Sequence, residues 1–322
     1  MRKVRATISA LLLPIPLAGC AMGSARDAGC DRACIVGLTD DYLAALASHD
    51  PSTAPFASNV AFVENFTRLK PGEGLWQSVT GGKGGFGIYV PDPRLQQSGW
   101  IGLVERGGKP VLLALRLKFE QRRIIEAEHV IAEPTDANLA NLVQPRRGLL
   151  ATIPTGQRLP HAELMRAGEQ YYDALDENDG SQAPFAADCQ LVENGRITAG
   201  AGQVAPSGTV PGQLPVANDC AGQISSQAFV YIDRIQNRRM VAADPVTGLV
   251  FGLSHFRQPM NNLPYKVTLA DGSTAERNRQ NLPNQPFDMA AAHIFKIGPD
   301  GQLHEIEVVG AVAPFNSPTG WD

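Results

Sequence analysis

The chain has 322 residues, of which 43% are hydrophobic and 19% are charged, and its formal net charge is −4. This composition can form an apolar core and excludes a disordered chain. Lys and Arg form no dense cluster, which argues against a nucleic-acid partner, because binding to phosphates requires clustered cations. The length predicts about two domains. The 32 glycines and 24 prolines favour a sheet-rich fold with many turns.

The chain opens with features of an export signal. Arg2, Lys3 and Arg5 precede an apolar stretch over 6–17 that is too short to span a bilayer as a helix. The stretch ends in Leu-Ala-Gly-Cys, which resembles the lipobox of bacterial lipoproteins, whose cysteine carries the lipid. We therefore expect lipid attachment at Cys20, with ordinary secretion and cleavage nearby as the alternative.

The expected location follows from this signal. Residues 1–19 would be removed as a signal peptide, and residues 20–30 would tether the protein to the membrane through the lipid on Cys20. Because Ala21 rather than aspartate follows the cysteine, we expect the outer membrane of a bacterial cell envelope, facing the periplasm. The membrane is thus one expected partner.

Four further cysteines follow, an even number that an oxidising compartment allows to pair. Cys189 and Cys220 flank a loop rich in small residues, and a disulfide between them would stabilise the fold by restricting the unfolded loop. Cys30 and Cys34 lie four residues apart at the edge of an expected helix, near the upper limit of disulfide geometry, so the sequence leaves their pairing open. The cysteines and scattered histidines form no zinc-ligand pattern, so no metal is expected.

One segment occurs twice. Residues 42–65 and 171–194 are identical at 12 of 24 positions without a gap, at an offset of 129. Both contain Ala-Pro-Phe-Ala and Val-Glu-Asn, so the chain contains an internal repeat. A second echo aligns two glutamates of the stretch 116–130 with two glutamates near residue 306 at an offset of 179. The second copy therefore carries about 50 extra residues, which read as loops.

Each copy begins with an expected helix and continues with strands. Apolar residues recur at helical spacing over 38–46 and 164–175. Alternating patterns predict strands over 111–119, 229–234, 249–255, 293–297 and 303–309. The domains expected from this pattern are a first one over 31–145, a linker over 146–160 and a second one with longer loops over 161–322.

This order is typical of an α+β fold. The succession of helix, Ala-Pro-Phe-Ala, Val-Glu-Asn, Gly-Glu-Gly-Leu-Trp and a long final hairpin resembles the nuclear-transport-factor-2-like, or polyketide-cyclase-like, cone, and more closely a two-copy family of unknown function. The resemblance implies two tandem cone-shaped domains, each a curved antiparallel sheet covered by a helix. It does not select a function, because such cones include isomerases, cyclases and binding modules.

Polar residues on apolar strand faces of the second copy are the candidate catalytic groups. His255 ends the apolar face that begins at Leu249, and Asp233 ends another apolar face. His293 aligns at an offset of 180 with Leu113, so the first copy has an apolar residue at that position. Two histidines and a carboxylate on inward faces would form a proton-transfer site without a cofactor. At strand ends they would instead meet solvent or backbone.

Four further residues are candidate ligand contacts: Tyr171, Tyr231, Glu193 and Trp76. Each also has a structural interpretation, as a core aromatic residue or part of a turn. Two hypotheses follow. The first is an envelope lipoprotein that binds a hydrophobic small molecule or has a structural role. The second is a cofactor-independent lyase, isomerase or cyclase that uses His and Asp in the second cone.

Overall fold

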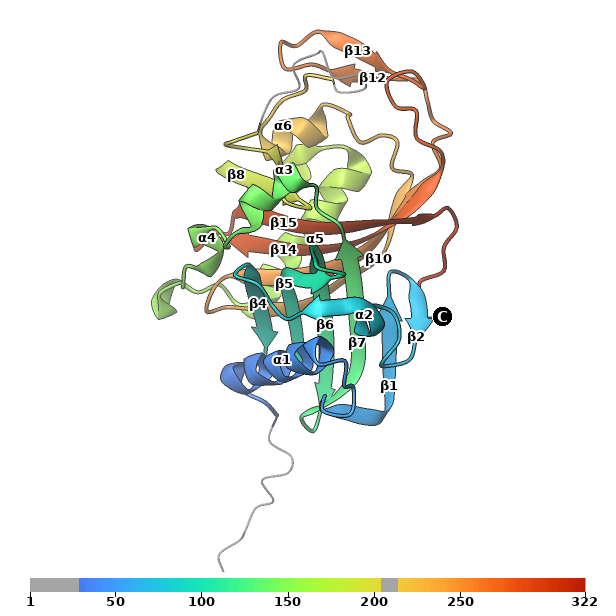
Figure 1. Cartoon of the computed structure of the whole chain (residues 1–322). Helices are drawn as coiled ribbons and strands as arrows, with labels where there is room; N and C mark the ends of the chain where they lie inside the picture. The colour runs from blue at the N-terminus through green and yellow to red at the C-terminus, as the bar shows by residue number, and fades with distance from the viewer. Residues whose placement is uncertain (1–28, 204–213, 322) are drawn as a thin grey trace, which may run out of the picture.

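The computed structural model describes residues 29–203 and 214–321. Cys20, the expected signal peptide and nearly all of the expected tether therefore lie outside the described residues. None of the helices within the described ranges is long and apolar enough to cross a membrane. The described chain forms two sheet-bearing halves that match the expected α+β class (Figure 1).

The first half contains helix α1 and a seven-stranded sheet in the order β2-β1-β7-β6-β5-β3, with β4 paired to β5. Asp31 caps α1, because its side chain accepts from the backbone N–H of Cys34. The elements are α1 (Arg32–Ala47), β1 (Phe56–Glu64), β2 (Thr67–Leu69), α2 (Leu75–Ser78), β3 (Val79–Gly81), β4 (Gly87–Asp92), β5 (Gln97–Arg106), β6 (Lys109–Glu120) and β7 (Arg123–Ala132).

Short helices and turns connect the halves: α3 (Asp136–Leu139), η1 (Ala140–Leu142), α4 (Arg147–Leu150) and η2 (Thr155–Gln157). The second half has a six-stranded sheet in the order β10-β11-β14-β15-β8-β9 and a separate hairpin. Its elements are α5 (His161–Glu177), η3 (Gly180–Gln182), β8 (Phe185–Glu193), β9 (Arg196–Ala199), α6 (Cys220–Ser225), β10 (Arg234–Asp244), β11 (Leu249–Gln258), β12 (Tyr265–Thr268), β13 (Thr274–Arg277), β14 (Phe287–Ile297) and β15 (Leu303–Pro314).

The two sheets share features of their topology. β1 pairs with β7 as β8 pairs with β15, and in both cases the strands are parallel. The register places Glu64 opposite His129 and Glu193 opposite Val308, in agreement with the offsets of 129 and 179. The parallel pair in each otherwise antiparallel sheet was not predicted, since periodicity carries no information on strand direction.

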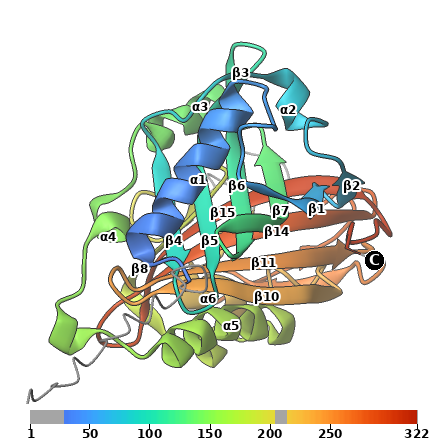
Figure 2. The ribbon, with the colours of Figure 1, turned by 90° about the horizontal axis from the view of Figure 1, so that it is seen from below.

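The sheets pack face to face, with a helix on the outer side of each (Figure 2). Three apolar clusters result: one between α1 and the first sheet, one between α5 and the second sheet, and one between the two sheets. Each sheet is therefore buried on both faces along much of its area. Ion pairs connect the halves, including the two-pronged contact of Arg239 with Glu128.

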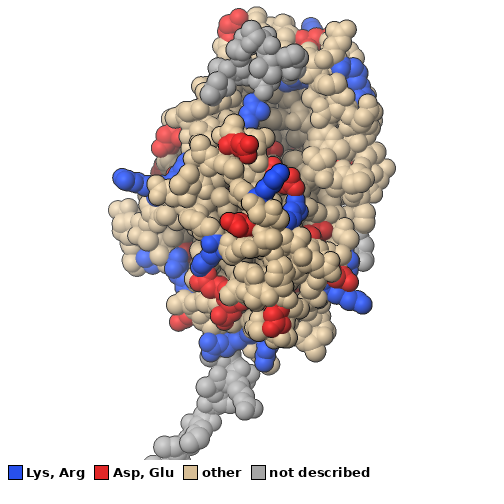
Figure 3. Space-filling model, in the orientation of Figure 1, with Lys and Arg blue, Asp and Glu red and all other residues tan. Residues whose placement is uncertain are grey.

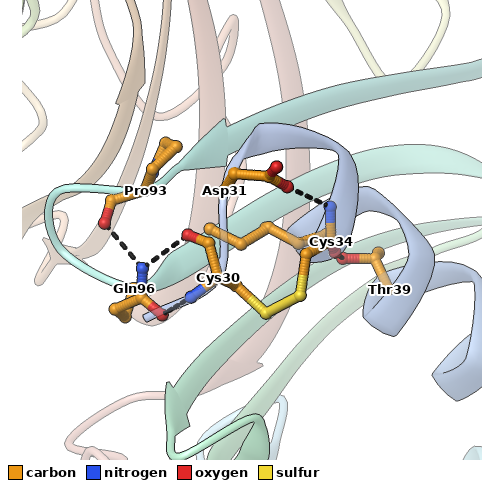
Figure 4. Close-up of a disulfide and its surroundings, with 7 residues drawn as sticks. Cys30, Asp31, Cys34, Thr39, Pro93 and Gln96 are labelled. Carbon is orange, nitrogen blue, oxygen red and sulfur yellow. Dashed lines mark hydrogen bonds between the residues drawn. A yellow bond between two sulfur atoms is a disulfide. The ribbon is translucent and has the colours of Figure 1, made fainter. Parts of the chain in front are cut away.

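Both pairs of cysteines in the described residues form disulfides. The predicted bond between Cys189 and Cys220 is confirmed, with Cα atoms 6.0 Å apart. Cys30 and Cys34 are also bonded, with Cα atoms 5.2 Å apart (Figure 4). Gln96 accepts from the backbone N–H of Cys30 and donates to its carbonyl, which fixes the start of α1.

The structure corrects two local predictions. Residues 229–231 form a turn, and β10 begins only at Arg234, so the expected strand over 229–234 is not formed. The pairing of β14 with β15 and of β6 with β7 places His293 opposite Val308 and Leu115 opposite His129. His293 therefore corresponds to Leu115 rather than Leu113, two residues further along the same strand face.

Candidate functional site

His255 and His293 lie on opposite faces of the second sheet. His293 packs on the α5 side, where its ring stacks on Phe295 at 5.5 Å between centroids. His255 faces the first half, where its ring lies 4.2 Å from that of Phe66, and its Nε2 lies 2.9 Å from the buried carboxylate of Asp288. The sheet backbone separates the two histidines, so they share no site.

Asp233 lies apart from both histidines. Its side chain is exposed, precedes β10 and pairs with Arg234 at 2.9 Å. The alternation that suggested an inward position does not apply, because residues 229–231 form a turn. The proton-transfer site expected from His293, His255 and Asp233 is therefore not formed.

The interior of the first cone is filled by protein. Trp76 and Leu75 on α2 are each 1% exposed, and the Trp76 ring packs edge-on against that of Tyr42 at 5.4 Å. Gly-Glu-Gly-Leu-Trp thus leads through a turn into the short helix α2, whose Leu75 and Trp76 fill the interior of the cone. This placement makes Trp76 a core residue rather than a ligand contact.

A buried hydrogen-bonded chain of three residues lies beside this plug. The Tyr42 hydroxyl is 2.8 Å from Nε2 of His129, and Nδ1 of His129 is 3.1 Å from Oε2 of Glu64. A carboxylate only accepts, so Nδ1 donates to Glu64, and Nε2 on the other side of the ring shares a hydrogen bond with the Tyr42 hydroxyl. Glu64 also accepts from the backbone N–H of Leu75. Every polar group of this chain thus has a protein partner.

The second cone contains a cavity of about 470 Å³ in the corresponding place. It opens between α5, α6, β8, β14 and β15, and four of the candidate residues line it: Tyr171, Glu193, Tyr231 and His293. Most of its wall is apolar and includes Leu191, Ile224, Phe229, Phe256, Phe287 and Met289. Its volume lies within the range of roughly 300–1,000 Å³ that is usual for small-molecule sites.

Tyr171 and Glu193 are the repeat equivalents of Tyr42 and Glu64, yet they lack the connecting histidine. Val308 stands where the first copy has His129. Within the described residues, the Tyr171 hydroxyl and the Glu193 carboxyl have no hydrogen-bond partner. Both groups line the cavity instead. The duplicated pair is thus satisfied internally in the first copy and open to an occupant in the second.

Burial controls the protonation of these groups. Desolvation raises the pKa of Glu193, and the nearby Arg196 partly opposes this effect. Desolvation, with a smaller effect of Glu193, raises the pKa of Tyr171, so its hydroxyl remains protonated as a donor. The pKa of Tyr231 is raised in the same way.

His293 presents a neutral ring to the cavity. Desolvation lowers its pKa to about 3, so it carries no charge near neutral pH. Its Nδ1 lies 3.0 Å from the hydroxyl of Tyr172, which leaves Nε2 without a partner in the described residues. Gln258 adds a further polar group to the cavity wall, and its buried Oε1 has no hydrogen bond to any part of the chain that the structure describes.

The asparagines that follow the repeated glutamates have a structural role. The side chain of Asn65 bonds both the carbonyl and the N–H of Ile131. Asn194 does the same with Gly310. Each asparagine also adopts a positive φ, which this residue tolerates better than most. They brace the parallel strand pair and position the adjacent glutamates.

Several cavity and core residues were not predicted from the sequence: His129, Tyr172, Gln258, Arg196 and Arg277. A signal existed for His129, because it directly follows the glutamates that align at an offset of 179, where the second copy has Val308. Tyr172 lies on α5, where the helical pattern marks it only as an apolar-face residue, and the others lie on strands whose pairing depends on the fold. Basic and acidic side chains intermingle over the face shown in Figure 3, without a region of one sign.

One family model matches part of the chain, almost entirely within its second half. Residues 157–310 match the model of a family described as Domain of unknown function (DUF8021), which covers less than half of the chain. A search of curated proteins gives no match.

Solved structures with similarity include a nuclear-transport-factor-2-like protein of unknown function from Cytophaga hutchinsonii, with 13% identity, a TM-score of 0.23, and coverage of 30% of this chain and 89% of that one. A protein from Kribbella flavida described as a candidate ketosteroid isomerase has 11% identity and a TM-score of 0.26, and the match covers 39% of this chain and 93% of that one. A candidate polyketide cyclase from Silicibacter has 14% identity and a TM-score of 0.29, and the match covers 48% of this chain and 92% of that one. Matches at these levels assign no activity to this chain.

Proposed function

We propose that the second cone binds a mostly apolar small molecule with a polar end group, and that the first cone is its structural partner. One observation carries this proposal: the Tyr-Glu pair that His129 satisfies in the filled cone recurs, without a partner in the described residues, at a cavity of about 470 Å³. Buried polar groups without partners are costly, so an occupant that bonds them gains affinity. The apolar wall would hold the rest of the molecule.

Binding of an anilinonaphthalene sulfonate dye tests this proposal. Leu191 lines the cavity, whereas Leu95 lies on the surface with 38% exposure, so Leu191→Trp and Leu95→Trp make the same change inside and outside the site. We expect the native chain and Leu95→Trp to bind one dye per chain, as counted by native mass spectrometry, and Leu191→Trp to lose binding. Dye binding that Leu191→Trp leaves unchanged would contradict the proposal.

A second candidate function is acid–base catalysis in the same cavity, without a cofactor. The observation that favours it is Glu193, a carboxyl with a raised pKa and no hydrogen-bond partner in the described residues. Such a group is suited to remove a proton next to a carbonyl and return it, while Tyr171 donates to the oxygen. In this candidate mechanism Glu193 is the base, a role for which the sequence had suggested His255 and Asp233.

Deuterium exchange distinguishes catalysis from binding. We expect an enzyme of this kind to speed the exchange of carbon-bound hydrogen of 2-tetralone with D₂O, as followed by mass spectrometry. Glu193→Gln, which keeps the size of the side chain but removes the base, should return the exchange to the uncatalysed rate. Equal exchange with the native chain and Glu193→Gln would rule out this candidate.

We further propose that the protein is a lipoprotein of the bacterial cell envelope, anchored through Cys20. The lipobox-like residues support this location, and the two disulfides of the described chain are typical of oxidising compartments. Mass spectrometry of the mature N-terminus should find Cys20 as the first residue with its lipid, and Cys20→Ala should remain unlipidated. An intact Met1 in the mature protein would overturn this proposal.

A further inference from the structure

The first cone shows what a partner of the Tyr-Glu pair looks like. Tyr42 and Tyr171 occupy equivalent positions on α1 and α5, and Glu64 and Glu193 occupy equivalent positions at the ends of β1 and β8. In the first cone an imidazole fits between the two side chains. One ring nitrogen is 2.8 Å from the tyrosine hydroxyl, and the other is 3.1 Å from the carboxylate.

In the second cone the ring is missing but its surroundings remain. Val308 lines the cavity at the position of His129, but its side chain ends at two methyl groups and has no ring. His293 does not replace the ring, since its Nδ1 already lies 3.0 Å from Tyr172. Within the described residues no backbone N–H bonds Glu193 in the way that Leu75 bonds Glu64. The space between Tyr171 and Glu193 therefore opens into the cavity.

We propose that the occupant of the second cone carries a planar edge with a hydrogen-bond acceptor and an N–H donor separated by one atom, as in an azole or a cyclic amide, and that this edge bridges Tyr171 and Glu193. The acceptor accepts a hydrogen bond from the Tyr171 hydroxyl. The N–H donates to the Glu193 carboxylate. This inference rests on the proposed binding function and specifies the chemical class of the ligand.

Three bicyclic probes of nearly equal size test the edge separately. Benzimidazole has both the acceptor and the N–H, indole has only the N–H, and 1-methylbenzimidazole has only the acceptor. Binding to the full chain is measured by calorimetry at mildly alkaline pH, where an imidazole ring is neutral. We expect benzimidazole to bind about fivefold or more tightly than either of the others, since each lacks one hydrogen bond.

Variants locate the preference in the proposed bridge. Tyr171→Phe should make benzimidazole bind no better than indole, and Glu193→Leu should make it bind no better than 1-methylbenzimidazole. Tyr172→Phe is the matched control, because the Tyr172 hydroxyl bonds His293 and should leave the preference unchanged. Val308→His, which restores the ring of the first cone, should abolish benzimidazole binding.

The outcomes separate the inference from the proposed function. Equal affinity of the three probes, or a preference that persists in both Tyr171→Phe and Glu193→Leu, would overturn the bridging edge. If the dye still binds in the cavity under those conditions, the proposed binding function stands without the edge. If neither dye nor bicyclic probe binds, both are wrong.

Discussion

At the scale of single residues, the two histidines of the second sheet show why the candidate site was only partly predictable. Alternation correctly placed His255 with Leu253 on one strand face and His293 with Phe295 on one strand face. It did not show that these are opposite faces of the sheet. Because the second sheet is buried between α5 and the first sheet, both faces are apolar, and no pattern in the sequence distinguishes them.

The sequence indicates Tyr171 and Glu193 as candidates individually, but it does not show that they face one cavity without a partner between them. Tyr171 and Glu193 stand out because they repeat, and the structure places both at the cavity. Their open state depends on Val308, which contacts the pair only through strand pairing of β15 with β8. Pairing of strands over 100 residues apart in sequence cannot be deduced from local periodicity.

The lowered pKa of His293 predicts acid sensitivity. Its pKa falls from 6.5 to about 3 on folding because the ring is buried. The neutral ring contributes its full stability above pH 6.5, and this contribution is lost as the pH falls towards 3, on the order of 1 kcal/mol per pH unit. Urea unfolding at several pH values should show the free energy of unfolding falling more steeply with acid in the native chain than in His293→Gln.

His304 is the matched control with the opposite sign. Its hydrogen bonds to Asp300 and Asp188 outweigh its partial burial, and they raise its pKa. The stability that it contributes is therefore present below its unfolded pKa and lost as the pH rises through the folded value. The free energy of unfolding of the native chain should exceed that of His304→Gln at low pH, and this difference should decrease as the pH is raised. Parallel curves for His293→Gln and the native chain would show that His293 is not buried as described.

At the scale of elements, helix-strand order and the repeat were clear from the sequence, whereas strand direction and the turn over 229–231 were not. The repeat was visible because α1 and α5 and the strands β1 and β8 align without a gap. Asparagine side chains bond across the parallel pairs of β1 with β7 and of β8 with β15. The asparagine of each Val-Glu-Asn braces the strand pair through the backbone of the neighbouring strand, which the sequence pattern does not specify.

Loss of an asparagine brace should destabilise the fold. Asn65→Ala or Asn194→Ala removes two hydrogen bonds to the adjacent strand and the tolerance of a positive φ, so we expect each to lower the free energy of unfolding by about 3 kcal/mol. Asn316→Ala separates the two effects, because Asn316 is exposed, has a positive φ and makes no side-chain hydrogen bond within the described ranges. Chemical unfolding should show a loss of only about 1 kcal/mol for Asn316→Ala. Equal losses for all three would mean that the brace contributes nothing.

At the scale of the whole molecule, the two halves share one apolar cluster between their sheets. The cluster between the sheets contains residues of both halves, including Phe251 of the second sheet. Amphipathic alternation predicted one buried face per sheet, and the second buried face became apparent only from the packing. In the face-to-face arrangement each half covers apolar surface of the other.

The two sheets approach closely at Gly99 on β5, which Phe251 covers. A Cβ atom at position 99 would lie 2.2 Å from Cγ of Phe251, so Gly99→Ala must push the sheets apart or displace a ring that is fully buried. We expect a loss of about 2 kcal/mol or more in the free energy of unfolding.

Phe251→Ala should itself cost about 3–5 kcal/mol but make room for the added methyl group. The double variant should therefore be more stable than the sum of the two losses by about 1 kcal/mol or more, as measured by chemical unfolding. Gly37→Ala is the control, since that glycine lies on the exposed side of α1 with nothing within 4 Å of its Cβ position, and alanine there should stabilise the helix by about 1 kcal/mol. Additive losses for Gly99→Ala and Phe251→Ala would show that the two sheets do not meet at this point.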